Sequence, residues 1–332
     1  MATPAGRADL ELGPVVARLR RRGVLPPGEE VSAEPLTGGV SSVVVRLTAG
    51  ASSVVVKRAL PRLRVTEEWR SAPERILREA EALQWAHALR PDRVPRILDI
   101  DAEHLVISME AAPEAWSNWK LTLLGGATDP GVAGSLGRAL AAWHSASAAD
   151  PTALARFADR RHFFDLRVSP FFLRVGRAHP GLAPQIDAVV DRLWARHDAL
   201  VHGDFSPKNV LVGERGLWVL DWETAHRGDP SFDVAFMLSH LLCKAVHRPA
   251  WRPGYRACAD AFTGAYLEAS SVPIDAEGLS RLVGCLVLAR VDGTSPVDYF
   301  DDPERQRARR LGSRALAEEG VEVAGLWELA GR

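Results

Sequence analysis

Cysteine and lysine are both scarce in this sequence of 332 residues. The cysteines form no CxxC pair and lack the spacing of metal ligands, which excludes a zinc or disulfide scaffold. An odd and sparse set of cysteines is typical of a reducing compartment and of buried thiols. The three cysteines are Cys243, Cys258 and Cys285. Only four of the 41 basic residues are lysines, which makes each of them a candidate functional residue: Lys57, Lys120, Lys208 and Lys244.

Long apolar runs and an excess of one charge are also missing. No stretch approaches the roughly 18 apolar residues of a membrane span, and the first twelve residues lack the apolar core of a leader. We therefore expect a cytoplasmic protein with no membrane partner. The 41 basic and 42 acidic residues nearly cancel, which excludes a generally basic nucleic-acid binder. Apolar residues make up 47% of the chain, enough for a sizeable core, and no feature indicates the oligomeric state.

The succession of patterns along the chain predicts an α+β protein with two lobes. Residues 1–110 would form a small β-rich N-lobe, and residues 111–332 a larger α-helical C-lobe. In the N-lobe we predict helices at 9–22 and 74–89, a hairpin of β-branched runs at 43–47 and 54–56, and strands at 94–100 and 105–109. In the C-lobe we predict helices at 132–143, 186–193, 229–241, 252–269, 276–290 and 303–318, with short strands between 200 and 220.

Two polar segments between apolar runs carry the residue types needed for chemistry. Asn209 follows Asp204 by five positions, and Asp221 and Glu223 follow the next apolar runs. One carboxylate can accept a proton, while an amide oxygen and a second carboxylate can hold a hard cation. Mg²⁺ prefers such oxygen ligands and usually shares them with phosphate. This combination is typical of phosphoryl transfer, in which positioning and charge neutralisation provide most of the catalysis.

His202-Gly203-Asp204 with Asn209, followed by Asp221, resembles the catalytic core of the aminoglycoside phosphotransferase/choline kinase family. That family shares the protein-kinase fold and phosphorylates small molecules, and the resemblance covers residues from about 30 to 300. It implies ATP and Mg²⁺ as cofactors, Asp204 as the catalytic base, and Asn209 and Asp221 as metal ligands. Glu223 would reach a second metal, as in the methylthioribose kinase branch, or alternatively would only pair locally.

Supporting residues are also implied in this region. We expect His202 to brace the loop by hydrogen bonding rather than to take part in the chemistry. The resemblance gives Asp233 the role of holding the catalytic-loop backbone. Lys208 would either neutralise charge on the γ-phosphate or remain an exposed loop lysine.

The resemblance places the nucleotide in the N-lobe. Lys57 would hold the α- and β-phosphates and pair with Glu79, with Glu81 as the alternative partner about 200° further round the helix. Two further sets of residues are implied. The loop over the phosphates would contain Gly38, Gly39 and Ser41, where glycines let backbone N–H groups approach phosphate. The hinge that contacts adenine would contain Met109, Glu110 and Ala112; alternatively, Met109 is an ordinary core residue.

The acceptor site is expected among the C-terminal helices and near Trp119. Arg290 and Asp292 precede a glycine-containing turn and are loosely similar to the sugar-binding segment of methylthioribose kinases. Alternatively, Arg290 only stabilises a helix end and Trp119 packs in the core. We expect a small hydroxylated substrate, sugar-like rather than polycationic.

The alternatives to such a kinase are an aminoglycoside-modifying kinase and a catalytically dead binding module with the kinase fold. A protein kinase is disfavoured because Pro230 follows Glu223 by only seven positions, too few for an activation segment that docks a peptide.

Overall fold

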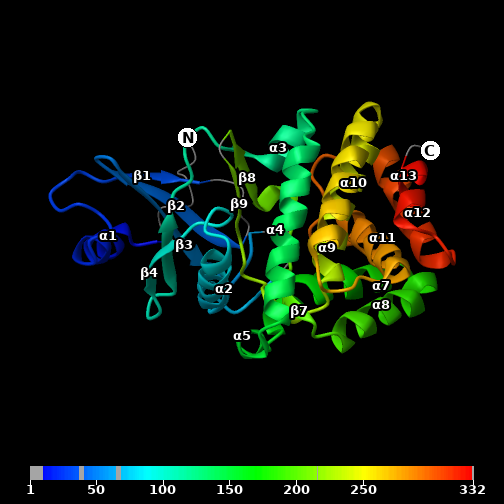
Figure 1. Ribbon diagram of the computed structural model, residues 1–332, viewed down its shortest axis with the longest axis horizontal. Coiled ribbons are helices and arrows are strands. Elements are labelled where there is room, and N and C mark those ends of the chain that lie inside the picture. The colour runs from blue at the N-terminus through cyan, green and yellow to red at the C-terminus, as the bar shows by residue number, and fades with distance from the viewer. Residues whose placement is uncertain (1–9, 37–40, 65–68, 215, 331–332) are drawn as a thin grey trace. The chain divides into compact units, whose positions relative to one another are not determined.

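The computed structural model describes residues 10–36, 41–64, 69–214 and 216–330. The chain forms two compact units, Met1–Trp116 and Ser117–Arg332 (Figure 1). Each unit is described by itself below.

The first unit contains an antiparallel five-stranded sheet with the strand order β1-β2-β3-β5-β4. Two helices accompany this sheet, α1 (Leu12–Arg21) and α2 (Arg75–Leu89). The strands are β1 (Ser32–Pro35), β2 (Ser42–Ala49), β3 (Ser52–Ala59), β4 (Ile97–Asp101) and β5 (Val106–Glu110).

Alternation of side chains creates the core of this unit. Val43, Val45 and Leu47 on β2 are buried together with Val54 and Val56 on β3. Residues two apart point to the same face of a strand, and β-branched side chains suit that pleated surface. The hairpin predicted from these valine runs is therefore confirmed, and the register of β3 that follows from it carries Lys57 to a buried position.

The second unit is mainly helical. Its strands form a three-stranded sheet, β6-β8-β9, and a two-stranded sheet, β10-β7. They are β6 (Ser117–Asn118), β7 (Ala199–Val201), β8 (Val210–Gly213), β9 (Gly216–Val219) and β10 (His226–Gly228). The longer helices are α4 (Pro130–Ala148), α8 (Ala183–Ala195), α9 (Ser231–His247), α10 (Arg252–Ala269), α11 (Ala276–Asp292) and α12 (Asp302–Ala317). The shorter ones are α3 (Trp119–Leu124), α5 (Pro151–Ala155), α6 (Arg161–Phe163), α7 (Arg174–Ala178) and α13 (Val323–Leu329), with a π-helical segment, η1 (Phe164–Leu173), and 3₁₀ turns η2 (Pro180–Leu182), η3 (Pro207–Asn209) and η4 (Pro249–Trp251).

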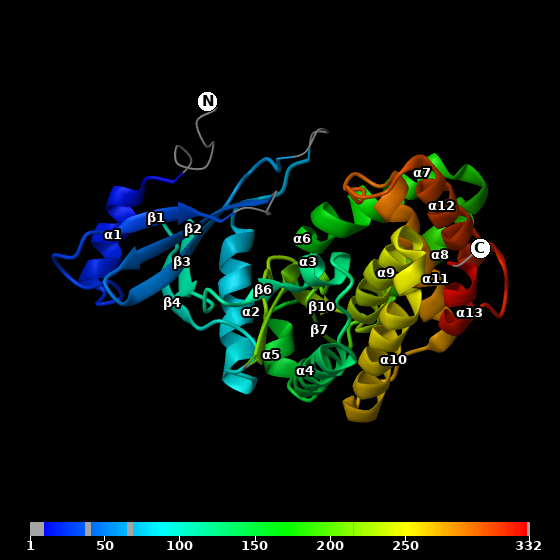
Figure 2. The ribbon, with the colours of Figure 1, turned by 90° about the horizontal axis from the view of Figure 1, so that it is seen from above.

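Helix α9 is the centre of the second unit. All of its residues except the last, His247, are buried. It packs against α10 and α11, which lie beside it in Figure 2. Helix α10 packs in turn on α4, where a Cβ at Gly137 would overlap the carbonyl oxygen of Phe262. A central helix that is buried on every side gives its first turn a fixed position, and that turn supports the loop that carries Asp204.

Most of the predicted elements are present, and the mixed α+β class is confirmed. Helix α10 has the predicted bounds, and α2, α11 and α12 begin or end within two residues of the prediction. The prediction did not include η1, whose π-helical geometry carries Pro170 inside it. All three cysteines are buried free thiols, as expected. Among the described residues, no helix has the length and apolar character needed to span a membrane.

Candidate active site

Asp204 lies on the loop between β7 and η3 and is almost completely buried. Its Oδ2 accepts from Asn209 Nδ2 at 2.8 Å and pairs with Arg167 Nη2 at 2.9 Å and Lys208 Nζ at 2.8 Å. Burial acts to raise the pKa of Asp204, but the charges of Arg167 and Lys208 outweigh it and hold that pKa below its ordinary value. The structure therefore holds an ionised carboxylate in a buried position.

Asp233, in the first turn of α9, fixes the backbone of this loop through hydrogen bonds. The two oxygens of Asp233 accept from the backbone N–H groups of His202 at 2.7 Å and Gly203 at 2.8 Å. His144 and Tyr266 continue the network, with Asp233 Oδ2 3.2 Å from His144 Nε2 and Tyr266 Oη 2.9 Å from His144 Nδ1. The predicted bracing by Asp233 is confirmed.

His202 connects the loop to the chain that precedes Asp221. Its Nδ1 accepts from the Asp204 backbone N–H at 3.1 Å, so Nε2 carries the proton and donates to the Leu220 carbonyl oxygen at 3.0 Å. Burial lowers the pKa of His202 below its ordinary value and favours this neutral form. The side chain thus acts as a neutral brace, as predicted.

Gly203 has a backbone conformation that other residues rarely adopt. Its φ is +80°, and a Cβ there would lie 2.6 Å from Thr224 Oγ1 and 2.9 Å from the Thr224 carbonyl oxygen. Thr224 Oγ1 in turn donates to the His202 carbonyl oxygen at 2.9 Å. Only glycine fits this position without displacing the loop that carries Asp204.

The sequence interpretation missed Arg167, which lies on η1. Its Nε donates to the Gly203 carbonyl oxygen at 2.7 Å, in addition to the ion pair with Asp204. The guanidinium also lies over the rings of Phe171 and Phe236, at 5.4 and 5.6 Å from their centroids. The available signal was an arginine inside an apolar run, Leu166 to Leu173, since such a residue is a candidate for a buried paired charge.

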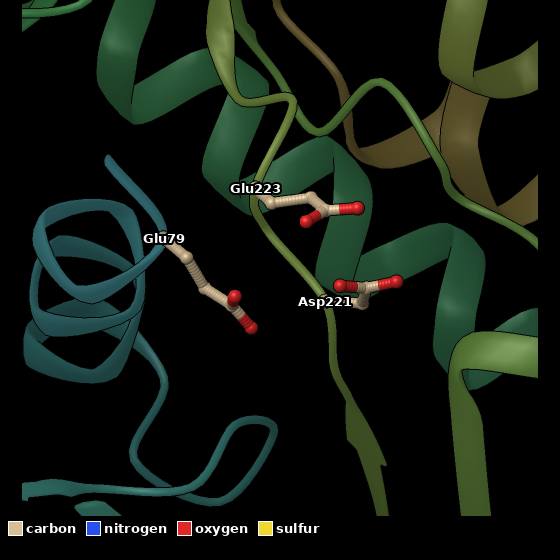
Figure 3. A group of neighbouring side chains, drawn as sticks. All are labelled: Glu79, Asp221 and Glu223. Atoms are coloured by element: carbon tan, nitrogen blue, oxygen red, sulfur yellow. The ribbon is translucent and has the colours of Figure 1, made fainter. Parts of the chain in front are cut away.

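Asp221 and Glu223 follow β9 on one segment of chain, and both carboxylates are visible in Figure 3. Their carboxylate groups offer oxygens within 4.8 Å of one another. Asp221 has a φ of +68°, an uncommon conformation that costs about 1 kcal/mol or more for a residue other than glycine. Asn209 uses its amide nitrogen toward Asp204, which leaves the amide oxygen as its ligand-type atom. This oxygen-rich set fits a hard divalent cation.

The first unit contains the predicted pair of Lys57 and Glu79. Lys57 Nζ on β3 lies 2.8 Å from the Glu79 carboxylate on α2, and the two residues are only 7% and 1% exposed. Glu81 points to another side of the helix and pairs with Arg78 at 3.1 Å. The predicted pairing and helix register are confirmed, whereas the contact of Lys57 with phosphate stays a prediction.

Two of the three residues predicted for the phosphate loop, Gly38 and Gly39, lie outside the described residues. The third, Ser41, is buried, and its carbonyl oxygen accepts from Arg75 Nη2 at 2.6 Å and from the Leu60 backbone N–H at 2.8 Å. Arg75 is a buried residue of α2 that the sequence interpretation also missed. It anchors the end of the predicted loop to the sheet.

The predicted hinge lies at the end of β5. Met109 is buried, and Glu110 pairs with Arg96 at 3.0 Å, through both its carboxylate and its backbone N–H. The Ala112 carbonyl oxygen accepts from Arg46 Nη2 at 3.2 Å. The contacts of Met109, Glu110 and Ala112 with adenine stay predictions.

The three residues predicted for the acceptor site have different surroundings. Arg290 is buried and lies 4.2 Å from the Phe171 ring centroid. Asp292 instead pairs with Arg309 at 2.7 Å and His179 at 2.8 Å. Trp119 is buried at the start of α3. Arg290 shares the rings of Phe171 and Phe236 with Arg167, the ion-pair partner of Asp204.

Comparison with known proteins gives one family. Residues 32–271 match the model of the phosphotransferase enzyme family. The chain is 27% identical over 248 residues to methylthioribose kinase from Yersinia pseudotuberculosis, a match that covers 66% of this chain and 60% of that protein. It is 29% identical over 273 residues to methylthioribose kinase from Erwinia tasmaniensis, covering 72% of this chain and 66% of that protein. The chain thus spans only about three fifths of the first relative.

Solved structures share the fold. A choline/ethanolamine kinase family protein from Mesorhizobium loti superposes with a TM-score of 0.57 at 15% identity, covering 97% of this chain and 99% of that chain. An amicoumacin kinase in complex with AMP-PNP and Ca²⁺ gives a TM-score of 0.58 at 12% identity, covering 96% and 98%. These likenesses confirm the kinase-like α+β fold. Since the family model covers most of the chain, the chain belongs to the phosphotransferase enzyme family.

Proposed function

We propose that this protein is an ATP- and Mg²⁺-dependent kinase that transfers the γ-phosphate to a hydroxyl group of a small molecule. The observation that carries the proposal is the buried, ionised Asp204, braced through Asp233 and His202. A buried carboxylate is expensive to maintain, and two cations and a rigid loop are devoted to keeping this one charged and fixed. Such a group is suited to orient an acceptor hydroxyl.

In the proposed reaction Asp204 accepts a hydrogen bond from the acceptor hydroxyl and takes its proton as the oxygen forms its bond to phosphorus. The bond between the γ-phosphorus and the bridging oxygen breaks, and the nucleoside diphosphate leaves. Lys208, with a half-exposed side chain 2.8 Å from Asp204, is placed to neutralise charge on the transferred phosphoryl group. Arg167 keeps Asp204 in position during this step.

Asn209, Asp221 and Glu223 would hold Mg²⁺. The metal would neutralise charge on the phosphate oxygens, which phosphoryl transfer requires. The support is the donor set itself, namely two carboxylates with oxygens within 4.8 Å and an amide whose oxygen faces away from Asp204. In the first unit, Lys57 would bind the nucleotide phosphates, with Glu79 fixing the lysine side chain.

The proposed acceptor is a compact, sugar-like molecule with a primary or secondary hydroxyl. The similarity to relatives named methylthioribose kinase supports a sugar-like acceptor. The Asp221 and Glu223 pair supports it as well, since that pair resembles the same branch.

The test is a turnover screen that measures nucleoside diphosphate production with ATP or GTP against sugars, amino alcohols and aminoglycosides. We expect Mg²⁺-dependent turnover of a sugar-like acceptor by the wild-type protein and about 10²–10⁴-fold less by Asp204→Asn. Turnover of aminoglycosides alone would replace the proposed acceptor class. A protein that binds ATP but phosphorylates no acceptor would instead be an inactive binding module.

A further inference from the structure

Arg290, on α11, is a buried cation for which the described part of the chain supplies no carboxylate partner. The residue is 8% exposed, and its Nη2 has no hydrogen-bond partner among the described residues. No acidic side chain in that part of the chain lies within ion-pair distance of its guanidinium. Instead the guanidinium lies over the faces of Phe171 and Phe236, 4.2 and 5.6 Å from their ring centroids. The two rings contact the planar guanidinium, but they supply no negative charge to compensate it.

Two other buried polar groups lie near Arg290: the His240 ring is 5.2 Å from the Phe236 ring that Arg290 lies over, and Tyr299 interacts electrostatically with Arg290. His240 Nε2 and Tyr299 Oη are buried atoms with no hydrogen-bond partner among the described residues. Burial, and then the charges of Arg290, Lys244 and two further lysines, hold the pKa of His240 well below its ordinary value. Lys244 is completely buried, and within the described part of the chain its Nζ makes one long contact, of 3.4 Å, with the His240 carbonyl oxygen. We call Arg290, His240, Lys244 and Tyr299 the cationic cluster.

The cationic cluster adjoins the proposed reaction centre. Arg167, which pairs with Asp204 at 2.9 Å, lies over the same two rings, Phe171 and Phe236, as Arg290 does. Burial, and then the charge of Arg167, lower the pKa of Arg290 to about 10 against the opposing charge of Asp204, so the guanidinium is still charged at neutral pH. Asp204 already pairs with Arg167 and Lys208, so its single charge is shared among cations. The nearby Lys120 pairs with the exposed Asp298 at 3.3 Å. The guanidinium of Arg290 therefore keeps its positive charge in a place where water is largely excluded, and no anion among the described residues is paired with it.

An unpaired charge in such a place is costly, and proteins normally pair it or leave it exposed. A residue that breaks this rule beside a reaction centre is a candidate for ligand binding. The fork of an arginine matches the two oxygens of a carboxylate or the oxygens of a phosphate. Tyrosine and imidazole donors complete such a site. The same charges would repel a polyamine, whose ammonium groups would face a like charge.

We propose that the acceptor carries an anionic group, a carboxylate or a phosphate, in addition to its reactive hydroxyl, and that Arg290 binds this group together with Tyr299 and His240. The proposal rests on the proposed kinase function and narrows its acceptor to hydroxy acids or phosphorylated hydroxyl compounds. Arg290 holds one end of the acceptor while Asp204 orients the hydroxyl at the other.

The first test measures anion binding without catalysis. Thermal unfolding of the full chain is followed with D-glycerate, inorganic phosphate or neutral glycerol, with NaCl holding ionic strength constant. We expect a saturable rise in Tm with at least one of the two anions, because a ligand that binds only the native state stabilises it. Glycerol should give no such rise. The rise should disappear in Arg290→Met and persist in Arg310→Met, a matched control on an exposed arginine of α12.

The second test uses turnover on matched acceptors, namely glycerate against glycerol, gluconate against glucose, and ribose 5-phosphate against ribose. We expect the anionic member to have the higher kcat/KM in the pair that is turned over. Arg290→Met should lower that kcat/KM by about 30-fold or more, mainly through KM, since truncating one partner of a buried charge pair costs at least this much. The neutral member should change by less than about threefold, and Arg290→Lys should restore only part of the loss.

Preference for the neutral members, or equal losses on both members in Arg290→Met, would overturn the anionic site but leave the kinase function supported. An absence of any anion-dependent Tm shift in the wild-type protein would overturn it as well. Anion binding that requires Arg290 without any phosphorylation would support the site and count against the kinase function.

Discussion

Two buried cations, one in each unit, show different uses of the same kind of charge. Lys57 in the first unit is paired with Glu79 at 2.8 Å, so its charge is compensated within the protein. Arg290 in the second unit is buried to a similar extent, yet its Nη2 has no partner among the described residues. The first arrangement fixes a side chain before any ligand arrives. The second leaves binding capacity that a ligand can complete.

The difference predicts opposite effects of substitution. Removing the partner of Lys57 leaves a buried uncompensated charge and destabilises the fold. Removing the charge of Arg290 takes away an existing penalty and stabilises it. A buried charge that lowers the stability of the fold is most simply explained by a function such as ligand binding. Asp204 is an intermediate case, since it is one anion shared between Arg167 and Lys208.

The largest expected effect concerns Asp204. In Asp204→Asn we expect the turnover of the identified acceptor to fall by about 10²–10⁴-fold, the range for loss of a general base. The affinity for nucleotide should remain nearly unchanged, because Lys57 and the metal ligands would hold the nucleotide. Steady-state kinetics and calorimetric titration with ATP separate the two quantities. Near wild-type turnover in this variant would show that Asp204 is not the base.

The next effect tests the paired cation. Glu79→Gln should destabilise the region around β3 and α2 by about 3 kcal/mol, the lower end of the cost of removing one partner from a buried ion pair. Glu81→Gln is the matched control, because Glu81 lies on the same helix and pairs with Arg78 at its surface, where such pairs contribute about 0–1 kcal/mol. Hydrogen exchange of peptides from β3 and α2 measures the change locally. Similar losses in both variants would contradict the distinction between the two carboxylates.

The sequence predicts the ion pair between Lys57 and Glu79 well. The alternation of valines along β2 and β3 determines which face Lys57 occupies, and the 3.6-residue period of α2 separates Glu79 from Glu81 by a large angle. Both signals are local. The spacing of Asp204 and Asn209 within one loop is local too, and the structure joins the two side chains at 2.8 Å.

The surroundings of Arg290, by contrast, depend on contacts between segments that are distant in the sequence. Arg167, on η1, pairs with Asp204 on the loop after β7. Arg290, on α11, contacts Phe171 on η1 and Phe236 on α9. Periodicity indicates that such residues are near a core, but it gives no information about which charges lack a partner there. The sequence interpretation selected Arg290 together with Asp292. Only the structure shows that Asp292 pairs with Arg309 and His179, while Arg290 has no such partner within the described ranges.

A third buried cation, Lys244, gives a pH-dependent effect. Burial lowers its pKa from 10.5 to about 7; the charge of Lys120 acts in the same direction, while Cys243 and Asp298 oppose it weakly. Between about pH 7 and 10.5 the unfolded chain binds a proton that the folded chain lacks, so this lysine makes stability rise with pH. Its slope is at most about 1.4 kcal/mol per pH unit. The stability advantage of Lys244→Met over wild type should therefore shrink from pH 7 to pH 9 in urea unfolding. A constant difference would contradict a depressed lysine pKa.

The smallest effect concerns Arg290 itself. Without ligand, Arg290→Met should increase the free energy of unfolding by about 1 kcal/mol, because methionine fills similar space against Phe171 without a buried charge. Arg310→Met should stay within about 0.5 kcal/mol of wild type, as exposed substitutions usually do. Urea unfolding at pH 7 measures both. If Arg290→Met were instead destabilised by several kcal/mol, the cation–π contact would be a structural requirement of the fold. Only a ligand-binding role predicts that Arg290→Met is stabilised without ligand and also loses the anion-dependent rise in Tm. If the arginine were purely structural, the variant would be less stable than wild type both with and without the anion.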